Sequence, residues 1–262
     1  MNHIVKIEKI IAGGKGLART ATGQVIMSSF VLADETVELA EAKRKSGYIE
    51  GEVVRIHSPS AARLEPFCPY YQECGGCDLQ HADYAEQLRI KRAVVKEATQ
   101  RAGVSIPDGG IKETVPSPAQ WGYRHRLRLK INASGQLGFF KKKSNDFVVV
   151  SSCPVATEGI NSALSELGET GSLRELAGVC KEVELLQSPI DGQITLVFPL
   201  KGKQTLPAVT VQGVADCASV DHVGCASRKG FRYLSPKPEP LSQNIALTDL
   251  RHNCALFWSG GC

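Results

Sequence analysis

Four cysteines, two of them followed by proline, constrain this chain of 262 residues more than any other feature. Cys68, Cys74 and Cys77 have the spacing C-x5-C-x2-C, and Gly75-Gly76 separates the last pair. Proline follows Cys68 and also the distant Cys153, as it often follows cysteines that bind iron–sulfur clusters. Two glycines let the backbone fold closely around a bound centre. These residues predict a four-thiolate site for a 4Fe–4S cluster or Zn²⁺.

The spacing favours a cluster but leaves zinc open. Zinc sites commonly pair their cysteines in two C-x2–4-C knuckles, whereas this chain offers one knuckle and two outlying thiols. In the alternative without a metal, Cys68 and Cys153 are ordinary buried thiols. Either centre would tie residues 68–77 to residue 153, which favours a structural role at least as strongly as a redox role. The other cysteines show no ligand spacing and are interpreted as core or incidental residues: Cys180, Cys217, Cys225, Cys254 and Cys262.

Composition places the chain among soluble globular proteins. The hydrophobic fraction of 42% and charged fraction of 22% exclude wholesale disorder. The longest mostly apolar stretch, 194–200, is far shorter than the ~20 residues of a membrane span. The first residues lack the layout of a signal peptide, and the odd count of nine cysteines argues against a fully paired disulfide framework. We therefore expect a cytoplasmic monomer with no membrane partner.

The first 57 residues predict a small barrel. Short apolar runs at 5–11, 24–27, 36–39 and 51–56 give four or five strands at nearly regular spacing. The glycines of 13–16 fall between two of these runs. No Gly-Lys-Ser/Thr follows at the offset of a phosphate-binding loop, so a tight hairpin turn with positive φ is favoured. Residues 57–60, His-Ser-Pro-Ser, are typical of a linker.

A helix is predicted after the cysteine motif. Asp83 and Glu86 have the spacing of a capping box, and Gly103 fits the end of the helix. A basic face carries Arg89, Arg92 and Lys96. The predicted core-facing stripe, at helical spacing, is Tyr84, Leu88, Val95, Ala98 and Ala102. Residues 104–122 are rich in Pro and Gly and predict a loop, after which the pattern predicts strands at 123–131, 183–186 and 194–200 and a helix at 161–167.

The strand at 123–131 is strongly basic on one face. Strand alternation places Arg124, Arg126, Arg128 and Lys130 on that face, about 6.6 Å apart, which is within the Debye length of about 8 Å. Such a row needs neutralisation, either by carboxylates on a neighbouring strand or by a phosphate backbone. Lys141-Lys142-Lys143 adds three cations.

The distribution of charge and the neighbouring aromatic residue favour RNA over the carboxylates. Residues 1–150 carry 22 Lys and Arg against 16 Asp and Glu, a net charge of +6, whereas 151–262 carry 9 against 11, a net charge of −2. Arginine also stacks on unpaired bases, and Tyr123 lies next to the row, which suits single-stranded or looped RNA.

Several of these motifs resemble the RNA (uracil-5-)-methyltransferases. The segment from Cys68 to His81 is similar to the iron–sulfur motif of that family, and the resemblance extends to Tyr84 and the basic helix after it, to 122–126, to Gly138-Phe139 and to Cys153-Pro154. The glycine turn at 13–16 and its flanks resemble the TRAM domain, an OB-like RNA-binding barrel of the 23S ribosomal-RNA branch. Together these matches cover about residues 4–160.

The resemblance implies the function and the ligands. It implies a 4Fe–4S cluster on Cys68, Cys74, Cys77 and Cys153, RNA binding by the barrel and the central domain, and S-adenosylmethionine as donor of a methyl group to a uridine of 23S rRNA. In this family a cysteine attacks C6 of uracil, C5 takes the methyl group, and a carboxylate assists removal of the C5 proton. The target base must leave its stack for this chemistry.

The end of the chain departs from the family pattern. Gln243 matches a cofactor-contacting glutamine and Asn253 a nearby asparagine, but only nine residues follow Asn253, whereas one βαβ unit needs about 30. We therefore expect no Rossmann-like methyltransferase domain in this chain, through truncation, a frameshift or a natural short form. No cysteine can be assigned as nucleophile, so no catalytic residue is predicted and the isolated chain is expected not to methylate RNA.

The predicted fold is α+β and mostly β. It comprises a TRAM-like OB barrel at 1–59, a central α+β iron–sulfur domain at 60–240, and a remnant of the entry to the methyltransferase domain at 241–262. The alternatives to an incomplete methyltransferase are a stand-alone RNA-binding iron–sulfur module without catalysis, and a structural zinc protein unrelated to RNA.

Overall fold

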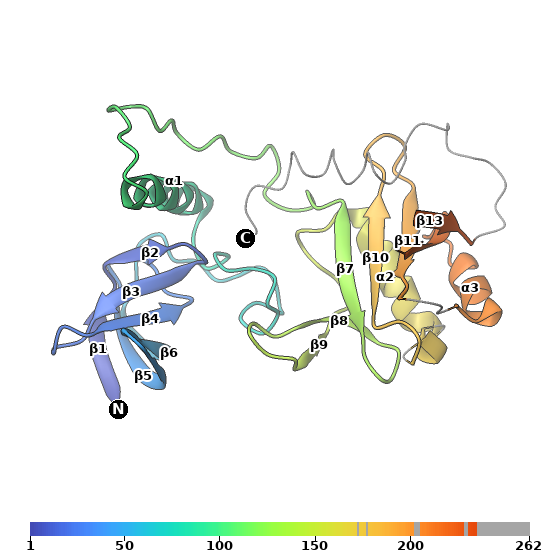
Figure 1. Cartoon of the computed structure of the whole chain (residues 1–262), viewed down its shortest axis with the longest axis horizontal. Helices are drawn as coiled ribbons and strands as arrows, with labels where there is room; N and C mark the ends of the chain where they lie inside the picture. Colours follow the sequence, from blue (N-terminus) through green and yellow to red (C-terminus); the bar gives the residue numbers. More distant parts are fainter. Residues whose placement is uncertain (172, 177, 202–204, 228–229, 235–262) are drawn as a thin grey trace. The chain divides into compact units, whose positions relative to one another are not determined.

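A computed structural model describes residues 1–234, except 172, 177, 202–204 and 228–229. These residues form two compact units. The first unit comprises Met1–Gln72 and Cys77–Pro118, and the second comprises Glu73–Gly76 and the described residues from Ala119 onward. Each unit is built on one mixed β-sheet with few helices, so the described chain is mostly β, as predicted (Figure 1). The domain division at 59 and 240 stays a prediction, and the segment 241–262 lies outside the described residues.

The sheet of the first unit has six strands in the order β1-β5-β6-β4-β3-β2. They are β1 Asn2–Lys6, β2 Lys9–Ile11, β3 Lys15–Arg19, β4 Val25–Ser29, β5 Thr36–Lys45 and β6 Tyr48–Ser58. β4 and β6 are parallel, whereas the other pairs are antiparallel. The runs predicted at 24–27, 36–39 and 51–56 lie in β4, β5 and β6, whereas the run at 5–11 is divided between β1 and β2, and β3 was not predicted. β5 and β6 are longer than expected and pair into a hairpin. Closure of this sheet into an OB-like barrel stays a prediction.

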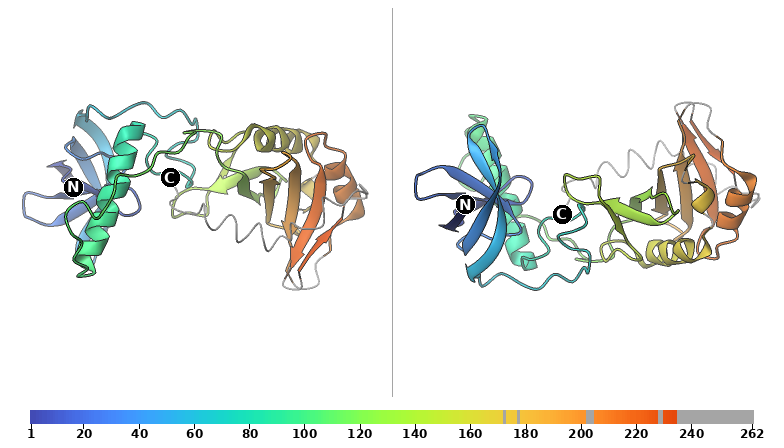
Figure 2. Two further views of the ribbon diagram at one scale, coloured as in Figure 1. Left: turned by 90° about the horizontal axis from the view of Figure 1, so that it is seen from above. Right: turned by 90° about the horizontal axis from the view of Figure 1, so that it is seen from below.

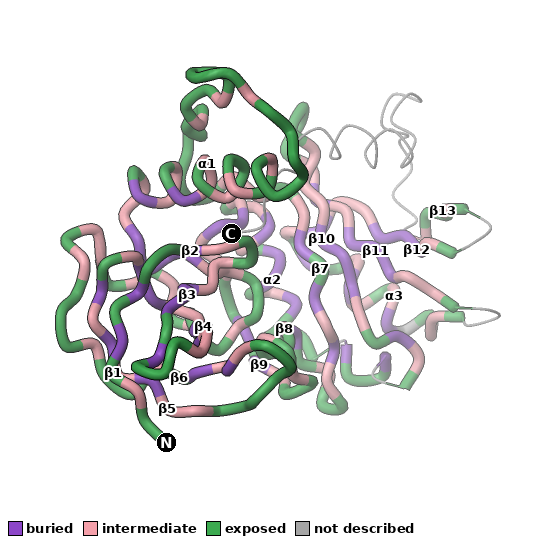
Figure 3. The backbone as a smooth tube through the Cα atoms, turned by 60° about the vertical axis from the view of Figure 1, so that its left-hand side comes forward, coloured by how far each residue is buried: buried purple, intermediate pink, exposed green. Residues whose placement is uncertain are grey.

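The core of the first unit follows from strand alternation. Val37 and Leu39 of β5 are fully buried, and so are Ile26 of β4 and Ile49 of β6. The far end of β5, from Ala42 onward, is exposed. Buried residues follow the strands of both units, whereas the segment 104–118 is mostly exposed (Figure 3).

Helix α1 spans Tyr84–Arg101 and begins as predicted: the Asp83 carboxylate accepts a hydrogen bond of 2.7 Å from the backbone N–H of Glu86. Gly103, with φ of +69°, follows its end. The predicted core-facing stripe is wrong, because Val95 is 51% exposed while Ile90 is only 6% exposed. Ile90, one turn after Glu86, packs in the core of the first sheet, and α1 lies against that sheet (Figure 2).

The second unit has a seven-stranded sheet in the order β13-β12-β11-β10-β7-β8-β9. Its strands are β7 Arg126–Ile131, β8 Leu137–Phe140, β9 Phe147–Val149, β10 Glu182–Gln187, β11 Ile194–Pro199, β12 His222–Ser227 and β13 Gly230–Tyr233. The predicted strands at 123–131, 183–186 and 194–200 correspond to β7, β10 and β11. The segment 104–122 forms no helix or strand, as predicted.

Three short helical elements accompany this sheet: α2 Glu158–Thr170, the 3-10 helix Arg174–Leu176 and α3 Ala208–Ala215. α2 buries Ile160, Ala163, Leu164 and Leu167, a spacing that forms one helical stripe, and packs on β10 and β11. It contains the helix predicted at 161–167. Within the described part of the chain, no helix has the length and apolar character needed to cross a membrane.

Candidate functional site

The predicted ligand cysteines differ from the other described cysteines in their surroundings. Cys68, Cys74, Cys77 and Cys153 are of intermediate exposure. Cys68 and Cys77 belong to the first unit, and Cys74 and Cys153 to the second. The others, Cys180, Cys217 and Cys225, are buried, which confirms their assignment to the core; burial raises the pKa of the Cys180 and Cys217 thiols. Cys254 and Cys262 lie outside the described residues.

Four partly accessible thiols have the donor chemistry that a 4Fe–4S cluster or zinc requires. No group of three or more His, Cys, Asp or Glu side chains is gathered closely enough to hold a metal ion within residues 1–234 as described. The metal centre and its four ligands therefore stay a prediction, supported by the donor set.

The Cys74 segment is attached to strand β8. The N–H of Gly75 donates a hydrogen bond of 3.1 Å to the carbonyl oxygen of Phe140, and Cys74 forms an isolated bridge with Lys141. A Cβ added at Gly75 would lie 3.0 Å from that same oxygen. Gly75 is therefore required for the close approach of two backbones, a role that differs from the one predicted from the sequence.

The Cys68 segment is attached to the first sheet through a buried imidazole. His81 is fully buried, and its Nε2 lies 3.2 Å from the carbonyl oxygen of Val31, which can only accept, so Nε2 carries the proton. Its Nδ1 then accepts a hydrogen bond of 2.7 Å from the Tyr71 hydroxyl. Burial lowers the pKa of His81 to about 4 and raises that of Tyr71, and Phe30 packs edge-on against the Tyr71 ring.

The glycine turn at 13–16 also lies against the cysteine motif. Gly13 and Gly14 have φ of +85° and +70°, which confirms the predicted tight turn. A Cβ added at Gly14 would lie only 2.7 Å from the Cβ of Asp78, the residue after Cys77. The turn thus needs glycine for its conformation and for the space that Asp78 occupies.

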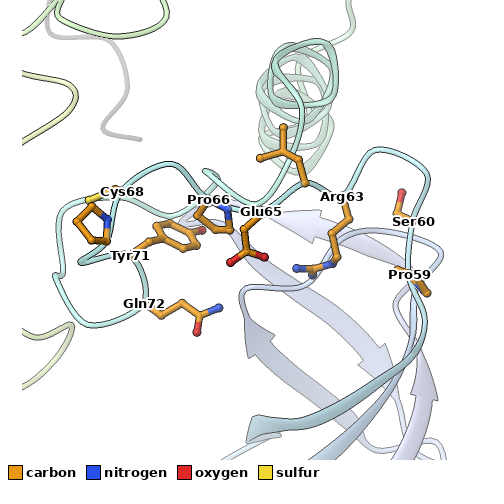
Figure 4. A pocket seen from close by; sticks show the side chains of 10 residues that line it. Pro59, Ser60, Arg63, Glu65, Pro66, Cys68, Tyr71 and Gln72 are labelled. Atoms are coloured by element: carbon orange, nitrogen blue, oxygen red, sulfur yellow. The ribbon is translucent and has the colours of Figure 1, made fainter.

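A cavity of about 570 Å³ opens between the linker and the Cys68 loop. Its lining includes Pro59, Ser60, Arg63, Glu65 and Tyr71 (Figure 4). The guanidinium of Arg63 is already engaged, because it donates to both carboxylate oxygens of Glu35, at 2.6 and 2.8 Å. This pair holds the segment after β6 against the loop before β5.

The basic strand meets a row of carboxylates. β7 pairs antiparallel with β10, in register Arg128 with Glu184 and Lys130 with Glu182. Arg126 and Arg128 both donate to the Glu184 carboxylate, and Lys130 donates to Glu182 and thereby lowers the pKa of its carboxyl. The neighbouring-strand carboxylates that the sequence left open are therefore present.

Arg124 and Lys141 lie outside the ion pairs between β7 and β10. The Arg124 side chain has no hydrogen bond or ion pair within the described residues. Lys141 lies 3.8 Å from Glu73, a distant and exposed pair, and Lys142 and Lys143 follow it directly after β8. RNA binding by the seven predicted cations stays a prediction.

Sequence reasoning missed Glu182 and Glu184 as partners of the basic strand. Glu182 and Glu184 are spaced two residues apart, as are Arg128 and Lys130. This shared strand period is the sequence signal that could have predicted the two ion pairs. It also missed His81 as an anchor, because a lone histidine gives no periodic signal. Gln243, the predicted contact to S-adenosylmethionine, lies outside the described residues.

Comparison with known proteins identifies the class. No family model matches the chain. The structure of a Pyrococcus abyssi tRNA (uracil-54, C5)-methyltransferase has been solved in complex with S-adenosyl-L-homocysteine, and it superposes on this chain with a TM-score of 0.59 at 20% sequence identity. The superposition covers 86% of this chain and 51% of the Pyrococcus chain. The fold of this chain is thus similar to that of about half of that structure.

Sequence relatives refine this class. The 23S rRNA (uracil(1939)-C(5))-methyltransferase RlmD of Vibrio cholerae is 36% identical over 225 residues, 82% of this chain and 48% of that protein. The same-named protein of Halomonas elongata is 33% identical over 195 residues, 73% of this chain and 39% of that one. An uncharacterized RNA methyltransferase of Aquifex aeolicus is 34% identical over 195 residues, which are 73% of this chain and 44% of the Aquifex protein. The chain belongs to the RNA (uracil-5-)-methyltransferase family and spans less than half the length of these relatives.

Proposed function

We propose that this protein serves the S-adenosylmethionine-dependent methylation of C5 of a uridine in 23S rRNA, and that the described residues bind the RNA and an iron–sulfur cluster. The observation that carries the proposal is the 36% identity, over 82% of the chain, to a protein with that name. The four partly exposed cysteines are the second support, because they occupy the positions of the motif that resembles the family's.

The basic strand can bind phosphate despite its carboxylate partners. The side chains of Arg126 and Arg128 remain 37% and 55% exposed in their ion pairs with Glu184. The Glu184 carboxylate itself is buried, so its displacement would be costly, but each guanidinium has further N–H donors and can bind a phosphate without leaving Glu184. Arg124 precedes β7, and the cations at 141–143 follow β8, the neighbour of β7 in the sheet. We propose that these seven cations contact the RNA backbone.

The first unit offers a second group of cations. Lys43 and Lys45 lie at the exposed end of the β5–β6 hairpin and form no ion pair within the described residues, whereas Arg44 between them pairs with Glu41. Unpaired cations on a projecting hairpin suit contacts to phosphates. They support RNA binding by the first unit, which we propose to be a TRAM-like OB barrel.

Cys68, Cys74, Cys77 and Cys153 are the proposed cluster ligands. When bound, the cluster would supply iron–thiolate bonds that stabilise the fold, or a centre for electron transfer. The chain's own residues hold the ligand segments: Gly75 attaches Cys74 to β8, and Tyr71 with His81 attaches the Cys68 loop to the first sheet. No described residue is assigned to S-adenosylmethionine.

RNA binding is tested with the full chain and fluorescent 23S rRNA fragments. We expect binding that weakens linearly with the logarithm of salt concentration, with a slope that falls by about 1 for each phosphate contact removed. Arg124→Ala should lower this slope, whereas the control Arg174→Ala, an exposed arginine outside the proposed surface, should not. No RNA binding at low salt would overturn the proposal.

Metal content is tested after anaerobic purification. A 4Fe–4S cluster predicts a brown protein with broad visible absorption and equal amounts of iron and acid-labile sulfide. A colourless protein that contains zinc would instead favour the structural zinc protein.

A further inference from the structure

Two predicted ligand cysteines are each held by a side-chain carboxamide. In the second unit, Asn161 lies in the first turn of α2, and its Oδ1 accepts a hydrogen bond of 2.8 Å from the backbone N–H of Cys153. Its Nδ2 donates to the carbonyl oxygens of Cys153, at 3.1 Å, and Ala156, at 3.3 Å. One side chain thus binds both backbone polar groups of the same cysteine.

The first unit has a smaller counterpart, in which a carboxamide binds only the backbone N–H of a cysteine. The backbone N–H of Cys68 donates to Oε1 of Gln80 at 3.3 Å. Gln80 is only 6% exposed, so its side-chain amide forms hydrogen bonds within the protein and not with solvent. It precedes His81, which is fixed by Tyr71 and Val31. The carboxamide is therefore carried by a rigid part of the chain.

The cysteines held in this way are the two that precede proline. A following proline restricts the backbone of the preceding residue to extended conformations, and the carboxamide fixes the N–H on its other side. The backbone of Cys68 and of Cys153 is thus constrained on both flanks, which leaves mainly rotation about χ1 to aim each sulfur. Outer-shell groups that orient metal ligands are typically worth a factor of 10 to 100 in metal affinity.

We infer that Asn161 and Gln80 are positioning residues that orient Cys153 and Cys68 for the metal centre. This inference rests on the proposed function, because it needs these cysteines to be ligands. Each residue acts within its own unit, and neither contacts the metal in this proposal. Their loss should loosen the ligand without removing a thiol.

The experiment compares Asn161→Ala and Gln80→Ala with two matched controls in the full chain. Asn132→Ala removes a carboxamide of the second unit that accepts from the backbone N–H of Ser134 and Gln136. Gln87→Ala removes one of the first unit that donates to the carbonyl of Ala82. The readouts are the rate of iron release to a chelator and the reduction potential and EPR spectrum of the reduced cluster.

We expect iron release about 10-fold to 100-fold faster in the two positioning variants, with an altered EPR spectrum, and wild-type behaviour in both controls. Asn161→Asp, which keeps the acceptor for the Cys153 N–H but loses both donors, should fall between wild type and Asn161→Ala. Amide hydrogen exchange over the two sheets separates loosening of the ligands from unfolding of a variant.

The outcomes separate the two hypotheses. A wild-type chain without iron and sulfide contradicts the proposed cluster, and the inference falls with it. A wild-type chain that holds a cluster, with variants that match their controls in iron release and spectrum, overturns the positioning role alone. Equal acceleration in variants and controls also overturns it, because any lost carboxamide would then have the same effect.

Discussion

Arg126 of β7 donates twice to one oxygen of Glu184 on β10, from Nη2 at 2.7 Å and from Nε at 3.1 Å. Arg128 donates to the other oxygen of the same carboxylate, at 2.7 Å. One glutamate thus neutralises part of the charge of two arginines. Any phosphate that binds this strand shares these guanidinium groups with Glu184, which makes this residue a sensitive probe of RNA binding.

Glu184→Gln should increase affinity for RNA and steepen its salt dependence. The substitution removes the competing charge and frees two guanidinium groups, each able to add a phosphate contact worth about 0.9 in the salt slope. Affinity is measured by fluorescence anisotropy at several salt concentrations. Glu169→Gln, which removes one charge from the exposed end of α2, is the control. Equal effects of the two substitutions would show that β7 does not contact RNA.

Arg63→Ala should destabilise the first unit strongly. The Glu35 carboxylate is fully buried, and without Arg63 it would keep only the backbone N–H groups of Leu32 and Ser60 as partners and lose its countercharge, at a cost of about 3–5 kcal/mol in the free energy of unfolding. Urea titration measures this loss. Arg101→Ala removes one partner of an exposed pair with Glu97 and should cost less than about 1 kcal/mol. A loss of less than about 1 kcal/mol for Arg63→Ala would contradict the role of Arg63 as the countercharge that stabilises the buried Glu35 carboxylate.

Acidification should weaken the fold through His81. Because its pKa is lowered to about 4, mainly by burial, the unfolded chain binds a proton between about pH 6.5 and 4 that the folded chain does not. This contribution to stability is complete above pH 6.5 and is lost as the pH falls, by up to the order of 3 kcal/mol. His81→Gln should unfold with a shallower pH dependence over this range. If the stability of His81→Gln depends on pH as steeply as that of the wild type, carboxyl groups and not His81 cause the acid sensitivity.

Alkylation should divide the described cysteines into two groups. In the metal-free chain, iodoacetamide is expected to modify Cys68, Cys74, Cys77 and Cys153 well before Cys180, Cys217 and Cys225, because burial keeps the latter inaccessible and, for Cys180 and Cys217, protonated. Mass spectrometry of peptides at successive times gives the rates. Reconstitution with iron and sulfide should then protect only the first group; protection of none would remove these thiols as ligands.

Local signals predicted much of the fold. Alternation located β7, β10 and β11, and the Asp83–Glu86 spacing located the start of α1. The inward face of α1 was misjudged because apolar residues occur on two of its faces and only packing against the first sheet selects Ile90 over Val95. Helix α3 and strands β12 and β13 gave no period strong enough to predict them.

The candidate site was predictable in its residues but not in its supports. The cysteines were found from spacing and from the family resemblance, yet Asn161 and Gln80 act through backbone contacts 8 and 12 residues away that no motif encodes. Likewise, 58 residues separate Arg126 from Glu184, so their pairing depends on sheet topology.

The course of the chain through its two units has a consequence for inheritance. Within the described residues, the chain leaves the first unit at Gln72, returns to it at Cys77 after four residues, and leaves it again after Pro118. Neither unit is therefore one continuous stretch of the gene. A recombination event that exchanged either unit at a single junction would separate Cys74 from Cys77 or strand a four-residue piece of the other unit. Exchange of one unit alone is therefore expected to break the proposed set of four cysteine ligands.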